Sequence, residues 1–184
     1  MPGAGKDTQA SFLEKKYRAN HISPGKIFRQ EITDKTKLGL EIQSIMKAGE
    51  FVDDETTCEI IRKEIELSRE FILNGFPRNV NQAKWLDAYC KENNIEIDTV
   101  FFLDITEQTA RERIKDRSSK TKRPEDASEE SIKKRFDIYN ETTLPLIEYY
   151  SKSLTIIQGN LSKEMVSNIV DVVARRKKPN ARYV

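Results

Sequence analysis

The glycine-rich segment at the start of the chain constrains the fold more than any other feature. Residues 2–8 read Pro-Gly-Ala-Gly-Lys-Asp-Thr, the second half of the phosphate-loop pattern G-x-x-x-x-G-K-[ST]. In such a loop, small residues let backbone N–H groups surround phosphate oxygens, Lys6 can reach the outer phosphates and the Thr8 hydroxyl can bind Mg²⁺. The following helix directs the positive end of its dipole at the same anion. A glycine-rich turn before an ordinary helix has a similar composition, so residues elsewhere in the chain are needed to distinguish a phosphate loop from such a turn.

The phosphate-loop pattern normally begins on a buried strand. The first glycine of the pattern and that strand would both precede Met1 in the printed sequence. We therefore expect a phosphate loop without the strand that usually delivers it. Neighbouring backbone groups would then be unpaired in the core, which lowers stability.

Short apolar runs alternate with amphipathic stretches along the rest of the chain. This order is typical of a parallel sheet that helices cover on both faces. Ligands of such sheets bind beyond the carboxyl ends of the strands, and polar or turn residues follow each apolar run. Expected strands are residues 21–23, 71–73, 99–103 and 154–157, and expected helices are residues 8–18, 27–49, 80–92, 109–117, 129–150 and 164–175, with one more after Asp53 and a disturbance at Pro145.

Composition limits the class of protein. A chain of 184 residues, with 37% hydrophobic and 34% charged residues, is long enough for one domain with a modest core and small inserted subdomains. A net charge of +2 does not indicate nucleic-acid binding. Cys58 and Cys90 lack metal-ligand spacing, which favours a reducing cytoplasm. The sequence contains no signal-peptide pattern and no apolar run of the ~20 residues that cross a membrane.

Six arginines give the expected crevice a chemical meaning. Each lies just after a strand end or beside residues 118–122, and planar guanidinium groups bind phosphates with two hydrogen bonds each. A single arginine is usually solvated surface charge, so only the convergence of several arginines indicates a phosphate site. The six are Arg29, Arg78, Arg113, Arg117, Arg123 and Arg135.

Several motifs occur together in one order. They are residues 2–8 with Gln9-Ala10, Ile22-Ser23-Pro24-Gly25 with Arg29, Gly49-Glu50-Phe51-Val52, Gly75-Phe76-Pro77-Arg78 with Gln82, Arg113 and Arg117, Arg123 with Asp126, and Arg135 with Tyr139. With these motifs the chain closely resembles the adenylate kinase family of nucleoside monophosphate kinases, from residue 2 to about residue 173.

The resemblance implies an α/β P-loop kinase fold with three layers, in which helices flank a parallel sheet. Residues 1–184 would form a single domain, with an inserted helical NMP-binding flap at about 24–53 and a short lid loop at about 117–126. The strand missing before Met1 would be the central one, between the strands ending at Asn74 and Leu103. No cysteine lies in the short lid, so we expect no structural zinc.

The resemblance also implies a reaction. The family transfers the γ-phosphoryl group of ATP to AMP, giving two ADP, with Mg²⁺, and serves adenine nucleotide homeostasis, usually as a monomer. Lys6, Arg78, Arg117, Arg123 and Arg135 would act in catalysis, and Thr8 would bind Mg²⁺. ATP would contact Gly3, Ala4, Gly5, Lys6, Asp7, Thr8, Arg113, Arg117 and Leu161. AMP would contact Pro24, Arg29, Glu50, Phe51, Val52, Gly75, Phe76, Pro77, Arg78, Gln82, Arg123 and Arg135, with the Gln82 amide reading adenine.

Four residues depart from the family pattern. Asn74 stands where an aspartate usually helps to hold the magnesium water shell, so we expect weaker organisation of Mg²⁺, which Asp104 could offset. Pro24 replaces a threonine of the nucleoside pocket, and Lys26 replaces an aspartate. Asp7 replaces a small residue and adds negative charge beside an anion site, unless its side chain points outward.

Two alternatives to an ATP:AMP phosphotransferase remain open at the level of sequence. A kinase of the same fold acting on UMP or CMP is favoured by the short lid and Asn79, whereas Gln82 favours adenine. An inactive module that only binds nucleotide is favoured by the missing strand.

Overall fold

The computed structural model describes residues 1–121, 123–126 and 128–176, so Lys122 of the predicted lid loop lies outside the described residues. Within them, β1 (Asn20–Ile22) pairs in parallel with β2 (Phe71–Leu73), and β3 (Val100–Asp104) pairs in parallel with β4 (Leu154–Gln158). All four strands lie at the predicted places, to within one or two residues. They form two separate two-stranded sheets instead of one continuous sheet.

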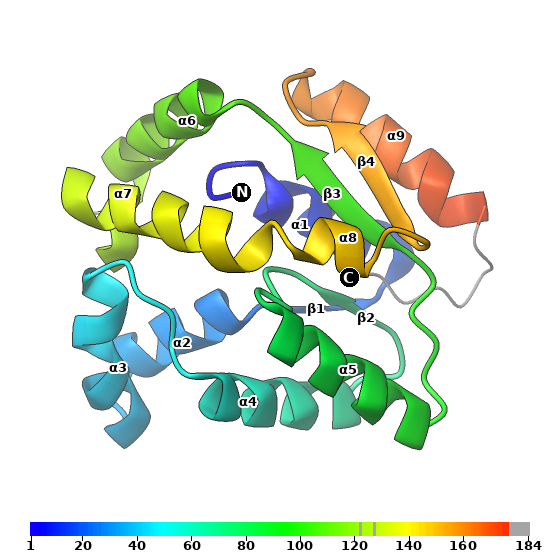
Figure 1. The fold of residues 1–184 in the computed structure, drawn as a ribbon, viewed down its shortest axis with the longest axis horizontal. Coiled ribbons are helices and arrows are strands. Elements are labelled where there is room, and N and C mark those ends of the chain that lie inside the picture. Colours follow the sequence, from blue (N-terminus) through cyan, green and yellow to red (C-terminus); the bar gives the residue numbers. More distant parts are fainter. Residues whose placement is uncertain (122, 127, 177–184) are drawn as a thin grey trace.

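Helices surround the two sheets (Figure 1). The first helix, α1, begins directly after the phosphate loop and contacts β1, β2 and α9, while α9 contacts β4 and α4 contacts β1. The apolar faces of α1 and α9 form one core with β3 and β4, and those of α4 and α5 form another with β1 and β2. The helices are α1 (Lys6–Tyr17), α2 (Pro24–Thr33), α3 (Lys37–Lys47), α4 (Asp54–Glu66), α5 (Val80–Glu92), α6 (Glu107–Lys120), α7 (Glu129–Ile138), α8 (Leu146–Tyr149) and α9 (Lys163–Arg176), with a 3₁₀ turn, η1 (Pro124–Asp126), and a π-helical turn, η2 (Tyr139–Thr143).

An apolar slot separates β2 from β3. Its cavity of about 190 Å³ is lined by side chains of both strands, and also by Tyr139 and Tyr150. The hydroxyl oxygens of these two tyrosines are buried and have no hydrogen-bond partner among the described residues. No strand of the described residues lies between β2 and β3. The slot therefore lies where the sequence predicts a missing central strand.

The predicted flap contains two helices instead of one. Residues 34–36 interrupt the helix expected over residues 27–49: Lys35 has a φ of 54°, and the Thr36 hydroxyl caps α3 by accepting from the Gly39 N–H at 3.0 Å. Phe28, Ile42 and other apolar side chains of the flap form a small core cluster of their own, and α3 contacts η1.

The predicted lid is shorter in the structure. α6 continues to Lys120 instead of ending near Arg117, so the irregular part of the lid lies between α6 and α7. The long helix expected over residues 129–150 is already broken at η2, before Pro145. No helix in the described part of the chain is long and apolar enough to span a membrane.

Candidate functional site

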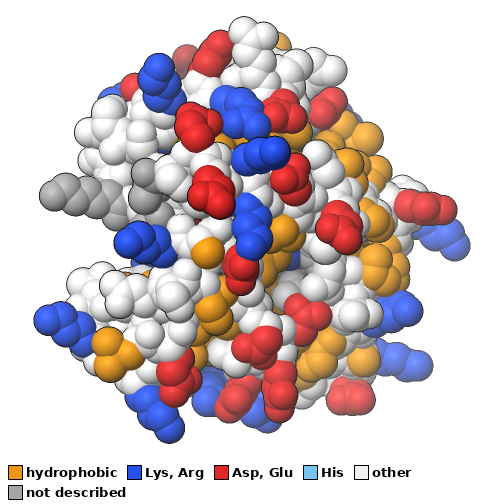
Figure 2. Space-filling view, turned by 60° about the vertical axis from the view of Figure 1, so that its left-hand side comes forward, with side chains coloured by type: hydrophobic (Ala, Val, Ile, Leu, Met, Phe, Trp, Pro, Cys, Tyr) orange, Lys and Arg blue, Asp and Glu red, His pale blue; other side chains and the backbone are white. Residues whose placement is uncertain are grey.

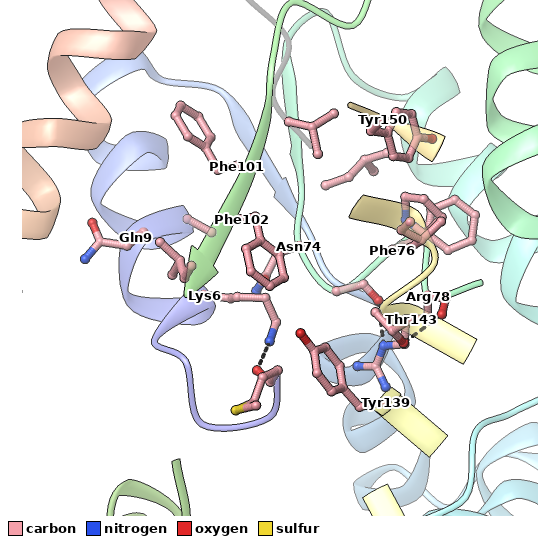
Figure 3. A pocket seen from close by; sticks show the side chains of 18 of the residues that line it. Lys6, Gln9, Asn74, Phe76, Arg78, Phe101, Phe102, Tyr139, Thr143 and Tyr150 are labelled. Carbon is pink, nitrogen blue, oxygen red and sulfur yellow. Dashed lines mark hydrogen bonds between the residues drawn. The ribbon is translucent and has the colours of Figure 1, made fainter. Parts of the chain in front are cut away.

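The phosphate loop begins the crevice. Gly5 precedes α1 with a φ of 95°, a conformation that favours glycine, and so turns the chain into the helix. The Lys6 Nζ donates to the Met1 carbonyl oxygen at 2.6 Å, at one end of the slot (Figure 3). Burial, together with the nearby positive charge of Arg78, lowers the pKa of Lys6 to about 8. An anion bound at this loop would stabilise the charged ammonium.

Four of the predicted arginines are held by three carboxylates. Arg117 donates to both oxygens of Asp126 at 2.8 Å, and Arg135 donates to the same carboxylate at 2.7 Å. The Asp126 side chain is only 1% exposed, so this arrangement is a buried ion-pair cluster. The other two pairs are Arg29 with Glu125 and Arg123 with Asp7, each at 2.8 Å.

Arg78 is placed differently from these four. Its Nε donates to the Gly75 carbonyl oxygen at 2.8 Å, and its guanidinium lies 4.4 Å from the ring centroid of Phe51. Over the residues that the structure describes, Arg78 makes no ion pair with a carboxylate. Burial and the charge of Arg135 lower its pKa to about 10, so it remains a cation at neutral pH. Arg78 therefore differs from these four in having no carboxylate partner to give up among the described residues.

Arg113 lies at the edge of this group of cations. Its Nη2 donates to the Gly159 carbonyl oxygen at 2.8 Å, which links α6 to the end of β4. Ala4 and Leu161 belong to the adjoining core, and a side chain at Gly3 would come within 2.7 Å of the Ala110 carbonyl oxygen. These predicted ATP residues thus lie near the phosphate loop, where the start of α1 approaches α6.

A second, smaller pocket of about 60 Å³ lies between the flap and α5. Nine of the twelve predicted AMP residues line it. The other three lie elsewhere: Phe76 is buried in the core with β2, Pro77 lines the slot and Arg123 pairs with Asp7. Those that line the pocket are Pro24, Arg29, Glu50, Phe51, Val52, Gly75, Arg78, Gln82 and Arg135.

The predicted adenine reader is already hydrogen-bonded within the protein. Gln82 accepts from the backbone N–H of Arg78 at 2.8 Å through its Oε1, and its Nε2 donates to Asp54 at 2.7 Å. Asn79 also donates to Asp54, at 2.9 Å. The orientation of the Gln82 side chain is therefore fixed by hydrogen bonds within the protein.

Sequence reasoning did not identify Glu125 as part of the site. Glu125, directly before Asp126, holds Arg29 of the flap. Asp7 does not point away from the crevice, because it contacts both Asn74 and Arg123. The signal that could have identified Glu125 is charge alternation, because Glu125 and Asp126 lie just after a segment rich in Lys and Arg.

Comparisons with known proteins agree with this arrangement. The family model described as Adenylate kinase matches residues 1–155. The chain is 40% identical over 174 residues to the adenylate kinase of Leptospira biflexa, covering 92% of this chain and 93% of that protein. It is 40% identical over 158 residues to the adenylate kinase of Prochlorococcus marinus strain MIT 9301, covering 85% and 84%. It is 33% identical to that of Clostridium tetani, covering 94% of both. The chain therefore belongs to the adenylate kinase family.

Proposed function

We propose that this crevice transfers the γ-phosphoryl group of ATP to AMP and releases two ADP. The observation that carries the proposal is the convergence of three arginines on Lys6. Arg78, Arg117 and Arg135 lie near enough for their charges to lower the pKa of Lys6. Phosphoryl transfer needs little covalent help from a protein, but it does need in-line positioning and cations around the equatorial oxygens. Membership of the adenylate kinase family, which makes the chain a nucleoside monophosphate kinase, supports the same reaction.

The arginines would exchange carboxylates for phosphates when nucleotides bind. Arg29 and Arg78 would hold the AMP phosphate, while Arg123 and Arg135 would close over the reacting groups. Arg113 and Arg117 would contact ATP from α6. Guanidinium groups form charge-assisted, often bidentate hydrogen bonds with phosphate as well as with carboxylate, so phosphates can replace the carboxylates as partners.

The flap at about 24–53 and the lid at about 117–126 would close over AMP and ATP, respectively. Closure excludes water, which would otherwise hydrolyse ATP. The ion pair between Arg29 of α2 and Glu125 of η1 supports this role, because it joins the two segments directly. In the flap pocket Gln82 would read adenine while Asp54 holds its amide in position.

Magnesium fits the residues at the loop. Thr8 and Asp7 offer a hydroxyl and a carboxylate oxygen, the hard donors that Mg²⁺ prefers. Among the described residues there is no group of three acidic, His or Cys side chains that could hold a metal by itself. Thr8 and Asp7 would therefore hold Mg²⁺ jointly with the ATP phosphates, and the ion would neutralise phosphate charge.

We further propose that the protein acts as a monomer in the cytoplasm and does not bind nucleic acid. Two buried free cysteines are compatible with a reducing compartment. On the face that Figure 2 shows, positive and negative side chains are interspersed, without the single-sign patch that nucleic acid requires.

A coupled assay of ADP formation with ATP and AMP, UMP or CMP tests the proposal. We expect AMP to give a kcat/KM at least about tenfold above that of either pyrimidine nucleotide, because the Gln82 amide matches adenine. The variant Lys6→Ala should be inactive, whereas Lys47→Ala, an exposed lysine at the end of α3, should behave like the unchanged chain. Equal or faster turnover with UMP or CMP would overturn the adenylate assignment.

A further inference from the structure

A negative side chain lies inside the phosphate loop. Asp7, in the first turn of α1, follows Lys6 and precedes Thr8. Its two oxygens have different partners: Oδ1 accepts from the Asn74 Nδ2 at 2.7 Å and Oδ2 accepts from the Arg123 Nη2 at 2.8 Å. A carboxylate at this place repels the phosphates of ATP unless a cation neutralises it. Arg123 supplies that cation in the structure.

The amide that orients Asp7 is itself held in place. Asn74 is 6% exposed, and its Nδ2 lies 3.0 Å from the His21 Nε2. Burial lowers the pKa of His21, so the ring is neutral near pH 7 and its Nε2 can accept a hydrogen bond. The two N–H groups of Asn74 therefore donate to His21 and to Asp7, respectively. A carboxylate at residue 74 would repel Asp7, so the amide and the acid match each other.

Arg123 cannot serve Asp7 and the phosphates at once. The proposed reaction moves its guanidinium to the transferred phosphoryl group, which would remove the ion pair that Asp7 makes in the structure and leave its carboxylate beside ATP. Asp7 is half exposed, with 49% of its side chain accessible, so its carboxylate can be reached from the crevice. The adjacent Thr8 hydroxyl adds a second hard oxygen donor.

We propose that Asp7 exchanges cations on nucleotide binding, from Arg123, its partner in the structure, to the magnesium ion that accompanies ATP. Asp7 is then a magnesium-positioning residue that the phosphate loop itself provides, and Asn74 holds it in orientation. The inference rests on the proposed use of Mg²⁺ by this crevice. It explains why an acidic side chain is tolerated among groups that bind anions.

Equilibrium binding of ATP, measured by calorimetry with excess Mg²⁺ and with EDTA, tests the exchange. The Kd with EDTA divided by the Kd with Mg²⁺ gives the factor by which metal tightens ATP binding, which we call the gain from metal. In Asp7→Asn, ATP should bind about tenfold more tightly than to the unchanged chain when metal is absent, because a repelling charge is removed and Arg123 is freed. The gain from metal should fall by about tenfold or more.

Arg123→Ala should act in the opposite direction. Without its guanidinium, ATP binding in EDTA weakens and the gain from metal increases, because Arg123 makes the one ion pair that Asp7 has among the described residues. The control Glu164→Gln removes an exposed carboxylate from the first turn of α9 and should leave both Kd values unchanged. Thermal melting of each variant establishes that it is folded.

The outcomes separate the exchange from the proposed function. An equal change of both Kd values in Asp7→Asn, with the gain from metal preserved, would overturn the exchange and leave magnesium use intact. If Mg²⁺ does not tighten ATP binding to the unchanged chain, the exchange is wrong, and the assay of ADP formation decides the proposed function separately. A reduced gain in Asp7→Asn and an increased gain in Arg123→Ala support the exchange.

Discussion

At the scale of single residues, the crevice gathers cations that repel one another. Lys6 lies near enough to Arg78, Arg135 and Arg117 for each of them to lower its pKa. Asp126 offsets part of this repulsion by binding two of these guanidiniums. Phosphate groups of the substrates can offset the rest, so binding energy is available to bring two polyanions together.

Arg78 provides the clearest test of a single cation. Arg78→Ala removes the guanidinium above Phe51, which makes no ion pair with a carboxylate among the described residues, and kcat/KM for AMP should fall by about 100-fold or more, the range found for groups that stabilise transition-state charge. Steady-state kinetics with varied AMP concentration measure this fall in kcat/KM. Arg62→Ala, an exposed arginine of α4, is the matched control, and a similar kcat/KM in both variants would contradict the assignment.

The pKa of Lys6 predicts how ATP binding depends on pH. With a pKa of about 8, Lys6 loses its charge as pH rises above 8, and binding of the ATP phosphates must then be accompanied by proton uptake at Lys6. The Kd for ATP should therefore increase between pH 8 and pH 9.5, by up to about tenfold per pH unit. Lys6→Arg, which does not titrate in this range, should show a flatter profile. A flat profile in the unchanged chain would show that Lys6 stays charged.

Sequence reasoning identified the cations but not their partners. The arginines follow strand ends or flank the lid, so the parallel order of the strands predicts their convergence. The pairing of Arg29 with Glu125, and of Arg123 with Asp7, joins segments about 100 residues apart. Periodicity contains no information on such pairs, because they depend on how the flap and the lid meet.

At the scale of elements, local pattern predicted where helices and strands occur but not every boundary. The break between α2 and α3 has no proline or glycine at its centre, and Lys35 adopts a positive φ that few lysines take. The end of α6 was misplaced because polar residues 118–120 suit either a helix or a loop. In both cases tertiary contacts decided between two locally acceptable conformations.

Gly49 controls how the flap meets α7. It has a φ of 77°, and a Cβ there would lie 2.4 Å from the Ser131 carbonyl oxygen. Gly49→Ala should destabilise the fold by about 1–3 kcal/mol and raise KM for AMP severalfold, because the flap must shift away from α7. Thermal melting and steady-state kinetics measure the two effects. Lys47→Ala, at the last residue of the preceding helix α3, is the control, and unchanged values in Gly49→Ala would refute the contact.

At the scale of the whole molecule, two small parallel sheets face each other across an apolar slot. The slot is lined by strand residues of β2 and β3 and by Tyr139 and Tyr150, whose hydroxyl groups have no hydrogen-bond partner within the part of the chain that the structure describes. Parallel strands on both sides, with apolar side chains between them, are suited to one more extended segment that pairs with both edges.

A strand added ahead of Met1 should therefore stabilise the protein. Five β-branched residues followed by glycine would bury apolar side chains in the slot, each worth about 1.5–3 kcal/mol, and raise Tm by at least about 5 °C. Differential scanning calorimetry compares this variant with one that carries a Gly-Ser extension of equal length. Equal melting midpoints would refute the slot as a strand site.

The central claim is that one crevice brings two nucleotides together for direct phosphoryl transfer. Labelling the γ-phosphate of ATP and following the label, with and without AMP, tests this claim most directly. We predict that the label moves to the β-phosphate of the ADP formed from AMP, only when AMP is present, and that Lys6→Ala abolishes the transfer. Release of the label as inorganic phosphate, at a rate independent of AMP, would contradict the account.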